Sequence, residues 1–216
     1  MKKISTIILD LGGVILNLEQ ELTFKSFSNL GFDLAKINDE STLFNDFEKG
    51  VIGESDFRNG IKKLHSETVN DKEIDEAWNS MLLDLPEDRI DLIKSLKSEY
   101  EVYLLSNTNS IHINCFKNYF DANFKNENWE SLFDEIFYSH EIGLRKPDAE
   151  IYEFVLSEIG KTPKECIFID DNKLNLLGAE SIGIRTIWAK QPLSKITLAE
   201  IKMIADAVAS RLKKMI

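Results

Sequence analysis

Four short apolar runs, rich in β-branched residues, recur along the chain and are separated by segments with helical spacing. The runs lie at 4–9, 102–105, 166–169 and 184–188. The segment 148–159 places apolar residues on one face and stops at Gly160, and the segment 87–99 does the same after Pro86. Strands that alternate with helices of ten or more residues form crossover units, which assemble into a parallel sheet covered on both faces. The sequence therefore predicts an α/β fold with a doubly wound parallel sheet.

The segment from 17 to 85 has no strand-like run, and its apolar residues recur at helical spacing. They include Leu18, Leu22, Phe27, Leu30, Phe57, Ile61, Leu64, Ile74, Ala77, Trp78 and Met81. We therefore expect an all-helical cap over 17–85, inserted into a core made of residues 1–16 and 86–216. The insert directly follows the first strand, so we expect it near the carboxyl end of that strand, where open α/β sheets bind ligands. A closing helix is predicted over 194–215.

Charge and cysteine content narrow the classes of partner. The chain has 216 residues with 37 acidic against 26 basic side chains, a net charge of −11. This field repels phosphate backbones and anionic lipids, so we expect neither a nucleic acid nor a membrane partner. Cys115 and Cys166 stand in no metal-ligand spacing, which favours two reduced, buried thiols over a disulfide or a zinc site. Asp10 ends the first apolar run too early for a secretory signal, and we expect a cytoplasmic monomer or small homo-oligomer.

Four polar clusters lie at predicted strand ends or just before a helix. They are Asp10 with Gly12-Gly13, Ser106-Asn107, Arg145-Lys146-Pro147, and Asp170-Asp171-Asn172 with Asn175 beyond. Taken singly, an Asp or a Ser-Asn pair after a strand usually forms a turn. Adjacent carboxylates repel each other, however, so a buried pair at a strand end requires a cation or an ammonium partner. Because strand ends of a parallel sheet share one rim, the sequence predicts that these groups gather in one site.

The order of these clusters resembles the four-motif signature of the haloacid dehalogenase superfamily. It is most similar to the capped phosphatases, the branch with bacterial sugar-phosphate phosphatases and the N-terminal phosphatase half of mammalian epoxide hydrolase. The resemblance covers nearly the whole chain and includes the residues around the motifs, at 139–147 and 168–172. It implies a Rossmann-like catalytic core with a small helical cap. The cap has a family-like length but no motif that identifies a substrate.

The resemblance implies a nucleophile and a metal site. Asp10 would attack phosphorus and become an aspartyl phosphate, which splits one difficult displacement into two steps. Magnesium would bind Asp10, the backbone carbonyl of Gly12 and Asp171, and Asp170 would join the metal or hold its waters. These are hard oxygen ligands, which Mg²⁺ prefers.

The resemblance also implies contacts to the transferring phosphoryl group. Ser106 and the backbone of Asn107 would donate hydrogen bonds to its oxygens, and Lys146 would neutralise charge on it and on Asp10. Asn175 stands where many relatives carry another acid. We expect this amide to orient Asp171 or Lys146 rather than to ligate the metal.

Position 12 departs from the family pattern. Phosphatases of this superfamily usually carry a second Asp two residues after the nucleophile, where it protonates the leaving oxygen, but this chain has Gly12. General acid–base help is worth about 10² to 10⁴ in rate, so its loss slows poor leaving groups while nucleophile and electrostatics remain. Three outcomes stay open: a slow phosphatase that favours good leaving groups, an acid supplied by the cap or the substrate, or a protein that binds phosphate without turnover.

The expected function is magnesium-dependent hydrolysis of a small soluble phosphometabolite, with sugar phosphates among the candidates. One alternative is a non-catalytic phospho-ligand binding protein, for which Gly12 is the argument. Another is hydrolysis of a carbon–halogen bond by attack of Asp10 without a metal, but the pair Asp170-Asp171 favours a cation and hence phosphate. Phosphonate cleavage would need a Schiff-base lysine in the cap, such as Lys62 or Lys63.

The three histidines, His65, His112 and His140, stand in no recognisable pattern with a partner. We interpret them as surface or internally satisfied residues, although His65 in the predicted cap is placed to donate a proton.

Overall fold

A five-stranded parallel sheet forms the centre of the computed structural model, which describes residues 3–32, 41–64, 69–189 and 201. The strands are β1 (Thr6–Leu9), β2 (Glu101–Ser106), β3 (Glu135–Tyr138), β4 (Cys166–Asp170) and β5 (Arg185–Trp188). Their order is β3-β2-β1-β4-β5, and every neighbouring pair is parallel. All four residues of β1 are buried. A central strand that is covered on both faces explains the continuous apolar run seen in the sequence.

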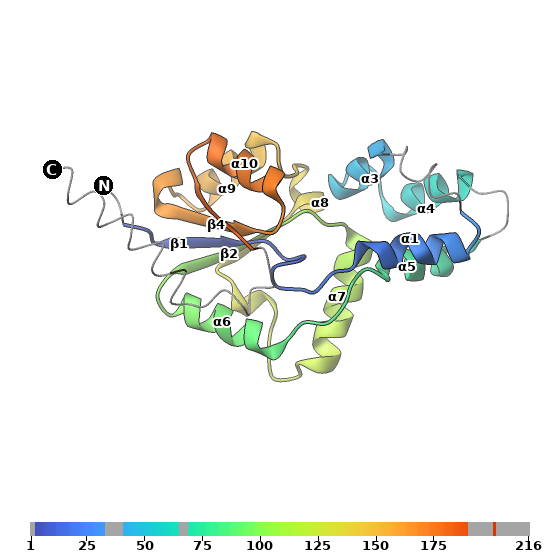
Figure 1. Cartoon of the computed structure of the whole chain (residues 1–216), viewed down its shortest axis with the longest axis horizontal. Helices are drawn as coiled ribbons and strands as arrows, with labels where there is room; N and C mark the ends of the chain where they lie inside the picture. The colour runs from blue at the N-terminus through green and yellow to red at the C-terminus, as the bar shows by residue number, and fades with distance from the viewer. Residues whose placement is uncertain (1–2, 33–40, 65–68, 190–200, 202–216) are drawn as a thin grey trace.

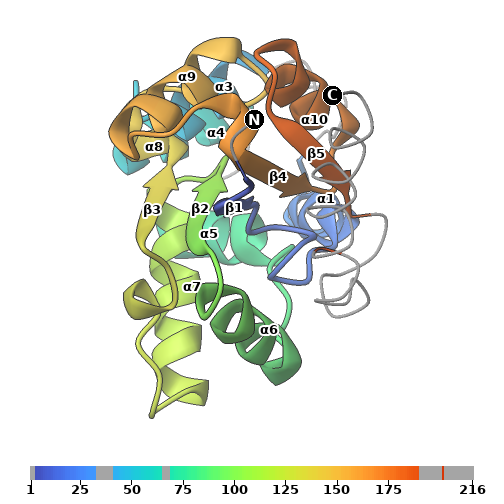
Figure 2. The ribbon, with the colours of Figure 1, turned by 90° about the vertical axis from the view of Figure 1, so that its left-hand side faces the viewer.

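Helices cover both faces of this sheet (Figures 1 and 2). They are α6 (Glu87–Lys97), α7 (Ser110–Asn123), α8 (Ser139–Ile142), α9 (Ala149–Glu158) and α10 (Lys173–Ser181), with short 3₁₀ turns at Glu130–Leu132 and Pro163–Glu165. Ile7 and Leu9 of β1 pack in one core cluster with α6 and α7, whereas Ile8 packs in another with α9 and α10. Alternate side chains of one strand thus enter opposite layers. The predicted doubly wound α/β fold is confirmed.

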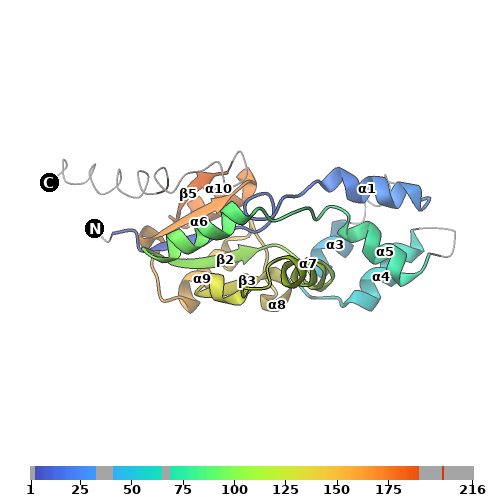
Figure 3. The same ribbon diagram turned by 90° about the horizontal axis from the view of Figure 1, so that it is seen from below.

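Four described helices lie between β1 and α6: α1 (Gln20–Asn29), α3 (Ser41–Glu48), α4 (Glu54–Lys63) and α5 (Asp71–Asn79). They gather beyond the carboxyl ends of the strands (Figures 1 and 3). They share an apolar core rich in aromatic rings, which includes Phe27, Phe47, Phe57 and Ile74. The chain enters and leaves this group through two antiparallel segments, where Leu18 is bridged to Leu82. The predicted helical content is therefore confirmed, and the division of domains near residues 17 and 85 stays a prediction.

One strand, one helix and the two cysteines complete the comparison of the fold with the sequence analysis. Strand β3 was not predicted, because Glu135 is exposed and Ile136 half-buried, which leaves a short apolar run. The expected helix over 194–215 lies outside the described residues. Cys166 is buried and Cys115 half-buried, and both are free in the structure, so the expectation that both are buried is wrong for Cys115. Within the described ranges, no helix has both the length and the apolar character needed to cross a membrane.

Candidate active site

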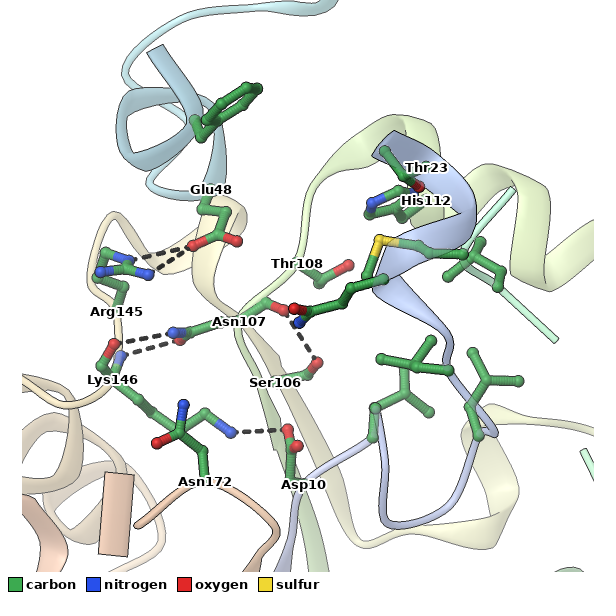
Figure 4. A pocket seen from close by; sticks show the side chains of 18 of the residues that line it. Asp10, Thr23, Glu48, Ser106, Asn107, Thr108, His112, Arg145, Lys146 and Asn172 are labelled. Atoms are coloured by element: carbon green, nitrogen blue, oxygen red, sulfur yellow. Dashed lines mark hydrogen bonds and ion pairs between the residues drawn. The ribbon is translucent and has the colours of Figure 1, made fainter. Parts of the chain in front are cut away.

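A buried lysine joins two carboxylates at the carboxyl ends of β1 and β4. Lys146 Nζ lies 2.6 Å from Asp10 Oδ1, 2.8 Å from Asp170 Oδ2 and 2.9 Å from the carbonyl oxygen of Leu105. Lys146 is 1% exposed and Asp170 fully buried. Since an ammonium has three protons, all of them are donated within this cluster. The ammonium is therefore held in one position beside Asp10 (Figure 4).

The side chain of Asn107 holds the loop that carries Lys146. Its Nδ2 donates to the carbonyl oxygen of Lys146 at 2.8 Å, and its Oδ1 accepts from the backbone N–H of Lys146 at 2.9 Å. Figure 4 shows the two dashed lines between these residues. This paired contact ties the segment after α8 to the end of β2, 39 positions earlier. The Asn107 amide thus positions Lys146, which the sequence alone did not predict.

Hydrogen bonds occupy both oxygens of Asp170. Oδ1 accepts from the backbone N–H of Asn172 at 2.7 Å, and Asn175 Nδ2 lies 3.2 Å from Oδ1 and 3.0 Å from Oδ2. The expectation that Asn175 orients Asp171 or Lys146 directly is therefore wrong, because its amide donates to Asp170. The reason is local: Asn172 caps α10, and the first helical turn brings Asn175 back over the last residue of β4.

The loop after Asp10 approaches Asp171 closely. Carboxylate oxygens of Asp10, Asp170 and Asp171 all lie within 4.8 Å of one another. Gly13 has φ +72°, and a Cβ there would lie 2.2 Å from Asp171 Oδ2. Glycine is thus required at this position, both for the positive φ and for the approach to the carboxylate.

The space beside Gly12 is already filled. A Cβ at position 12 would lie 2.4 Å from Leu18 Cδ1. The isobutyl group of Leu18 therefore stands where a side chain at position 12 would begin. The chain lacks an acid at this position, and a side chain there would require the terminal methyl group of Leu18 to move.

The site holds three carboxylates and one ammonium, so it is short of positive charge. Burial, together with the nearby charges of Asp170 and Asp171, raises the pKa of Asp10 to about 7, against the opposing effect of Lys146. Burial and Asp170 also raise the pKa of Asp171. The pKa of Lys146 is raised because the two carboxylates outweigh the effect of its burial. A cation with a preference for oxygen ligands would relieve this imbalance.

A cavity of about 590 Å³ opens above these groups, and its walls come from both the sheet and the helical insert. The residues of the four predicted clusters that line it are Asp10, Gly12, Ser106, Asn107, Arg145, Lys146, Pro147, Asp171, Asn172 and Asn175. Asp170 lies beneath them, outside the lining, and Ser106 is buried. The structure thus brings together Asp10 and Asp171, which are 161 positions apart in the sequence.

The insert contributes lining residues that were not predicted from the sequence. Among them are Thr23, Glu48 and Trp78, and His112 of α7 also lines the cavity. Glu48 of α3 accepts from Arg145 at 2.8 Å, across 97 positions. Arg145 is the residue before Lys146, so this ion pair links the insert to the loop that carries Lys146. Helical spacing predicts that such residues lie on helices, but it carries no signal for which of them face the cavity.

Comparison with known proteins agrees with this geometry. The model of a protein family described as haloacid dehalogenase-like hydrolase matches residues 4–183. The chain belongs to this family. The resemblance inferred from the four clusters is therefore confirmed for this haloacid dehalogenase-like hydrolase.

Relatives of this hydrolase include a D-ribitol-5-phosphate phosphatase from Bacteroides thetaiotaomicron, 28% identical over 189 residues that cover 85% of this chain and 90% of that protein. A solved haloacid dehalogenase family enzyme from the same organism, in complex with magnesium and inorganic phosphate, matches with a TM-score of 0.77 and 37% identity. That match covers 86% of this chain and 93% of the other. A predicted hydrolase of this family from Porphyromonas gingivalis has a TM-score of 0.76 and 28% identity, covering 87% and 91% of the two chains.

Proposed function

We propose that this hydrolase is a magnesium-dependent phosphomonoesterase that acts on a small phosphorylated sugar or sugar alcohol through an aspartyl phosphate. The observation that carries the proposal is the Asp10 carboxylate, held 2.6 Å from a buried ammonium at the floor of a cavity that Asp171 also lines. The phosphatase activity of the ribitol-phosphate relative supports it, as do the magnesium and phosphate in the solved relative.

The donor set fits a magnesium ion. Asp10, Asp171 and the backbone carbonyl of Gly12 would hold it, and a bound ion would supply positive charge to the phosphoryl oxygens. Asp170 has both oxygens engaged by protein donors, so we assign it the task of holding Lys146. This narrows the earlier expectation, in which Asp170 joined the metal or held its waters.

The remaining residues act on the phosphoryl group. An oxygen of Asp10 would form a bond to phosphorus while the bond to the ester oxygen breaks, and water would then release phosphate and restore the carboxylate. Lys146 would hold the carboxylate and stabilise charge on the transferring group. The Ser106 hydroxyl and the backbone N–H of Asn107 would donate to its equatorial oxygens.

Release of phosphate from a panel of phosphomonoesters, measured with and without Mg²⁺, tests this proposal. We expect release that requires the metal. Binding of the esters without any release would favour the non-catalytic alternative, and metal-independent release of halide from haloacids would favour carbon–halogen hydrolysis. The geometry does not support phosphonate cleavage, because Lys62 and Lys63 line a pocket other than the cavity at Asp10, and Lys62 forms an ion pair with Asp71. His65 lies outside the described residues.

The space at Gly12 leads to a prediction for leaving groups. Gly12→Asp alone is expected to bring only a small gain in rate, because its Cβ would lie 2.4 Å from Leu18 Cδ1 unless the Leu18 side chain moves. Combined with Leu18→Ala, the new carboxylate has room, and hydrolysis of alkyl phosphates is expected to rise by about 10². Steady-state kinetics on alkyl and aryl phosphates measure this, with Leu18→Ala alone as control. If Leu18→Ala alone raised the rate as much as the double variant does, the new acid would contribute nothing.

The raised pKa of Asp10 predicts how stability depends on pH and metal. Burial raises the pKa of Asp10 in the folded protein to about 7, above the 3.8 of the unfolded chain, so Asp10 takes up a proton more readily in the folded state. Asp10 therefore contributes stability at low pH that is lost as the pH rises through that range. Mg²⁺ binds the deprotonated carboxylates, so we expect it to raise the melting temperature more at about pH 8 than at about pH 5. Thermal unfolding at both pH values, with and without Mg²⁺, measures the difference, and equal increases would contradict it.

A further inference from the structure

His112 lies in the wall of the active-site cavity but belongs to none of the motifs. It is buried, and Figure 4 shows it beside Thr23, on the side of the cavity away from Asp10. Its ring stacks on the indole of Trp78, with centroids 4.9 Å apart and planes 8° from parallel. Trp78 also stacks on Phe44, with centroids 5.3 Å apart, so His112 belongs to a packed aromatic part of the cavity wall.

The hydrogen bond to Asn79 determines the tautomer of His112. Nδ1 lies 2.8 Å from Asn79 Oδ1, and since an amide oxygen only accepts, Nδ1 carries the proton. Burial lowers the pKa of the imidazole to about 3, so the ring is neutral at physiological pH. Nε2 therefore presents a lone pair and acts as an acceptor. Among the described residues, Asn79 is the hydrogen-bond partner of the ring, and Nε2 has none.

Further hydrogen bonds hold the backbone of His112 and its stacking partner Trp78. Asn109 Oδ1 caps α7 by accepting from the backbone N–H of His112 at 3.0 Å, and it lies 3.4 Å from Trp78 Nε1. Thr23 donates through its hydroxyl to the carbonyl oxygen of Trp78 at 3.0 Å. The acceptor is thus fixed by residues of α1, α5 and α7 before any ligand binds, which is the arrangement that gives specificity at low entropic cost.

We infer that His112 is a specificity-determining residue, whose Nε2 accepts a hydrogen bond from a substrate hydroxyl remote from the phosphate. The inference rests on the proposed function and names the feature that the substrate must carry. A polyhydroxylated phosphomonoester would donate one of its hydroxyl protons to Nε2. An alkyl phosphate of equal length would fill the same space but leave a buried acceptor without a donor, which costs affinity.

A matched pair of substrates tests this role. The wild-type protein is expected to hydrolyse a pentitol 5-phosphate with a higher kcat/KM than n-pentyl phosphate, which has the same carbon chain without the hydroxyls. One hydrogen bond to a neutral acceptor is worth about 1 kcal/mol, so His112 should account for about five- to tenfold of this preference. The difference should appear mainly in KM, because the contact is made in the ground state as well as in the transition state.

Two variants separate the acceptor from the rest of the ring. In His112→Asn, the amide nitrogen is separated from Cα by the same number of bonds as Nδ1 of histidine. It can therefore still donate to Asn79, whereas the acceptor at the position of Nε2 is lost. In His112→Gln, the amide oxygen stands as many bonds from Cα as Nε2. We expect His112→Asn to lower the preference for the pentitol ester about five- to tenfold and His112→Gln to restore much of it. His140→Asn makes the same change at a histidine outside the cavity lining and is expected to leave the preference unchanged.

The outcomes distinguish this inference from the proposed function. If neither ester were hydrolysed, the proposed function would be wrong, but the role of His112 in recognition could still be tested. Calorimetry with the Asp10→Asn variant would then measure the affinity for each ester. Equal affinity for the two esters would overturn the role of His112, as would a preference that survives His112→Asn. Should His112→Asn fail to fold, His112→Phe replaces it: this variant keeps an aromatic ring beside Trp78 but has no acceptor, so a preference equal to that of the wild-type protein would overturn the role.

Discussion

Asp10→Asn is expected to lower the rate of phosphomonoester hydrolysis by about 10⁴-fold or more, because an amide cannot serve as the nucleophile. The amide has nearly the same shape as the carboxylate, and its oxygen can still accept from Lys146, which lies 2.6 Å from Asp10 Oδ1. We therefore expect the variant to fold and to bind phosphate esters. Single-turnover kinetics with Mg²⁺ and circular dichroism measure the two properties.

The same chemical change at an exposed position provides the control. Asp91 lies on the exposed face of α6 and does not line the cavity, so Asp91→Asn is expected to retain full activity. If Asp10→Asn kept the rate of the wild-type protein while folded, the assignment of the nucleophile would be wrong. A rate that falls in both variants would instead point to a general effect of charge.

The central strands and the motif residues could be predicted because both depend on local sequence. Strands β1, β2 and β4 are buried on both faces, so each leaves a continuous apolar run, whereas the edge strand β3 has an exposed Glu135 and leaves too short a run. Asp10, Ser106 and Asp171 could be placed together because parallel strands end at one rim. No knowledge of side-chain packing was needed for this step.

The rest of the site depends on packing between segments far apart in the sequence. Asn175 was assigned to Asp171 or Lys146, whereas the helical turn of α10 directs it to Asp170. The role of His112 depends on a contact with Asn79, 33 positions away, and the space at Gly12 depends on Leu18. Helical periodicity identifies which residues lie on a helix face, but the orientation of that face toward the cavity is a tertiary property.

Lys146→Met is expected to reduce both stability and activity, because it leaves Asp10 and Asp170 buried without their common counter-ion. Removing one partner of a buried ion pair costs about 3 to 5 kcal/mol of unfolding free energy. Loss of a donor that stabilises charge in the transition state lowers kcat by about 10² to 10³. Methionine keeps the length and apolar stem of lysine, so the loss of charge dominates over the loss of packing. Urea unfolding and steady-state kinetics measure the two effects.

The stability deficit of Lys146→Met is expected to shrink as the pH falls. Without the ammonium, burial and the neighbouring carboxylates raise the pKa of Asp10 above its present value of about 7, so at about pH 5 the carboxyl is protonated and carries no unpaired charge. Lys161→Met is the matched control, since Lys161 pairs with the half-exposed Glu101 at the surface, where such a pair is worth about 0 to 1 kcal/mol. Two results would contradict the assignment of Lys146 as the counter-ion that holds the nucleophile in place. One is a loss of unfolding free energy in Lys146→Met no larger than in Lys161→Met, and the other is a loss that grows on acidification.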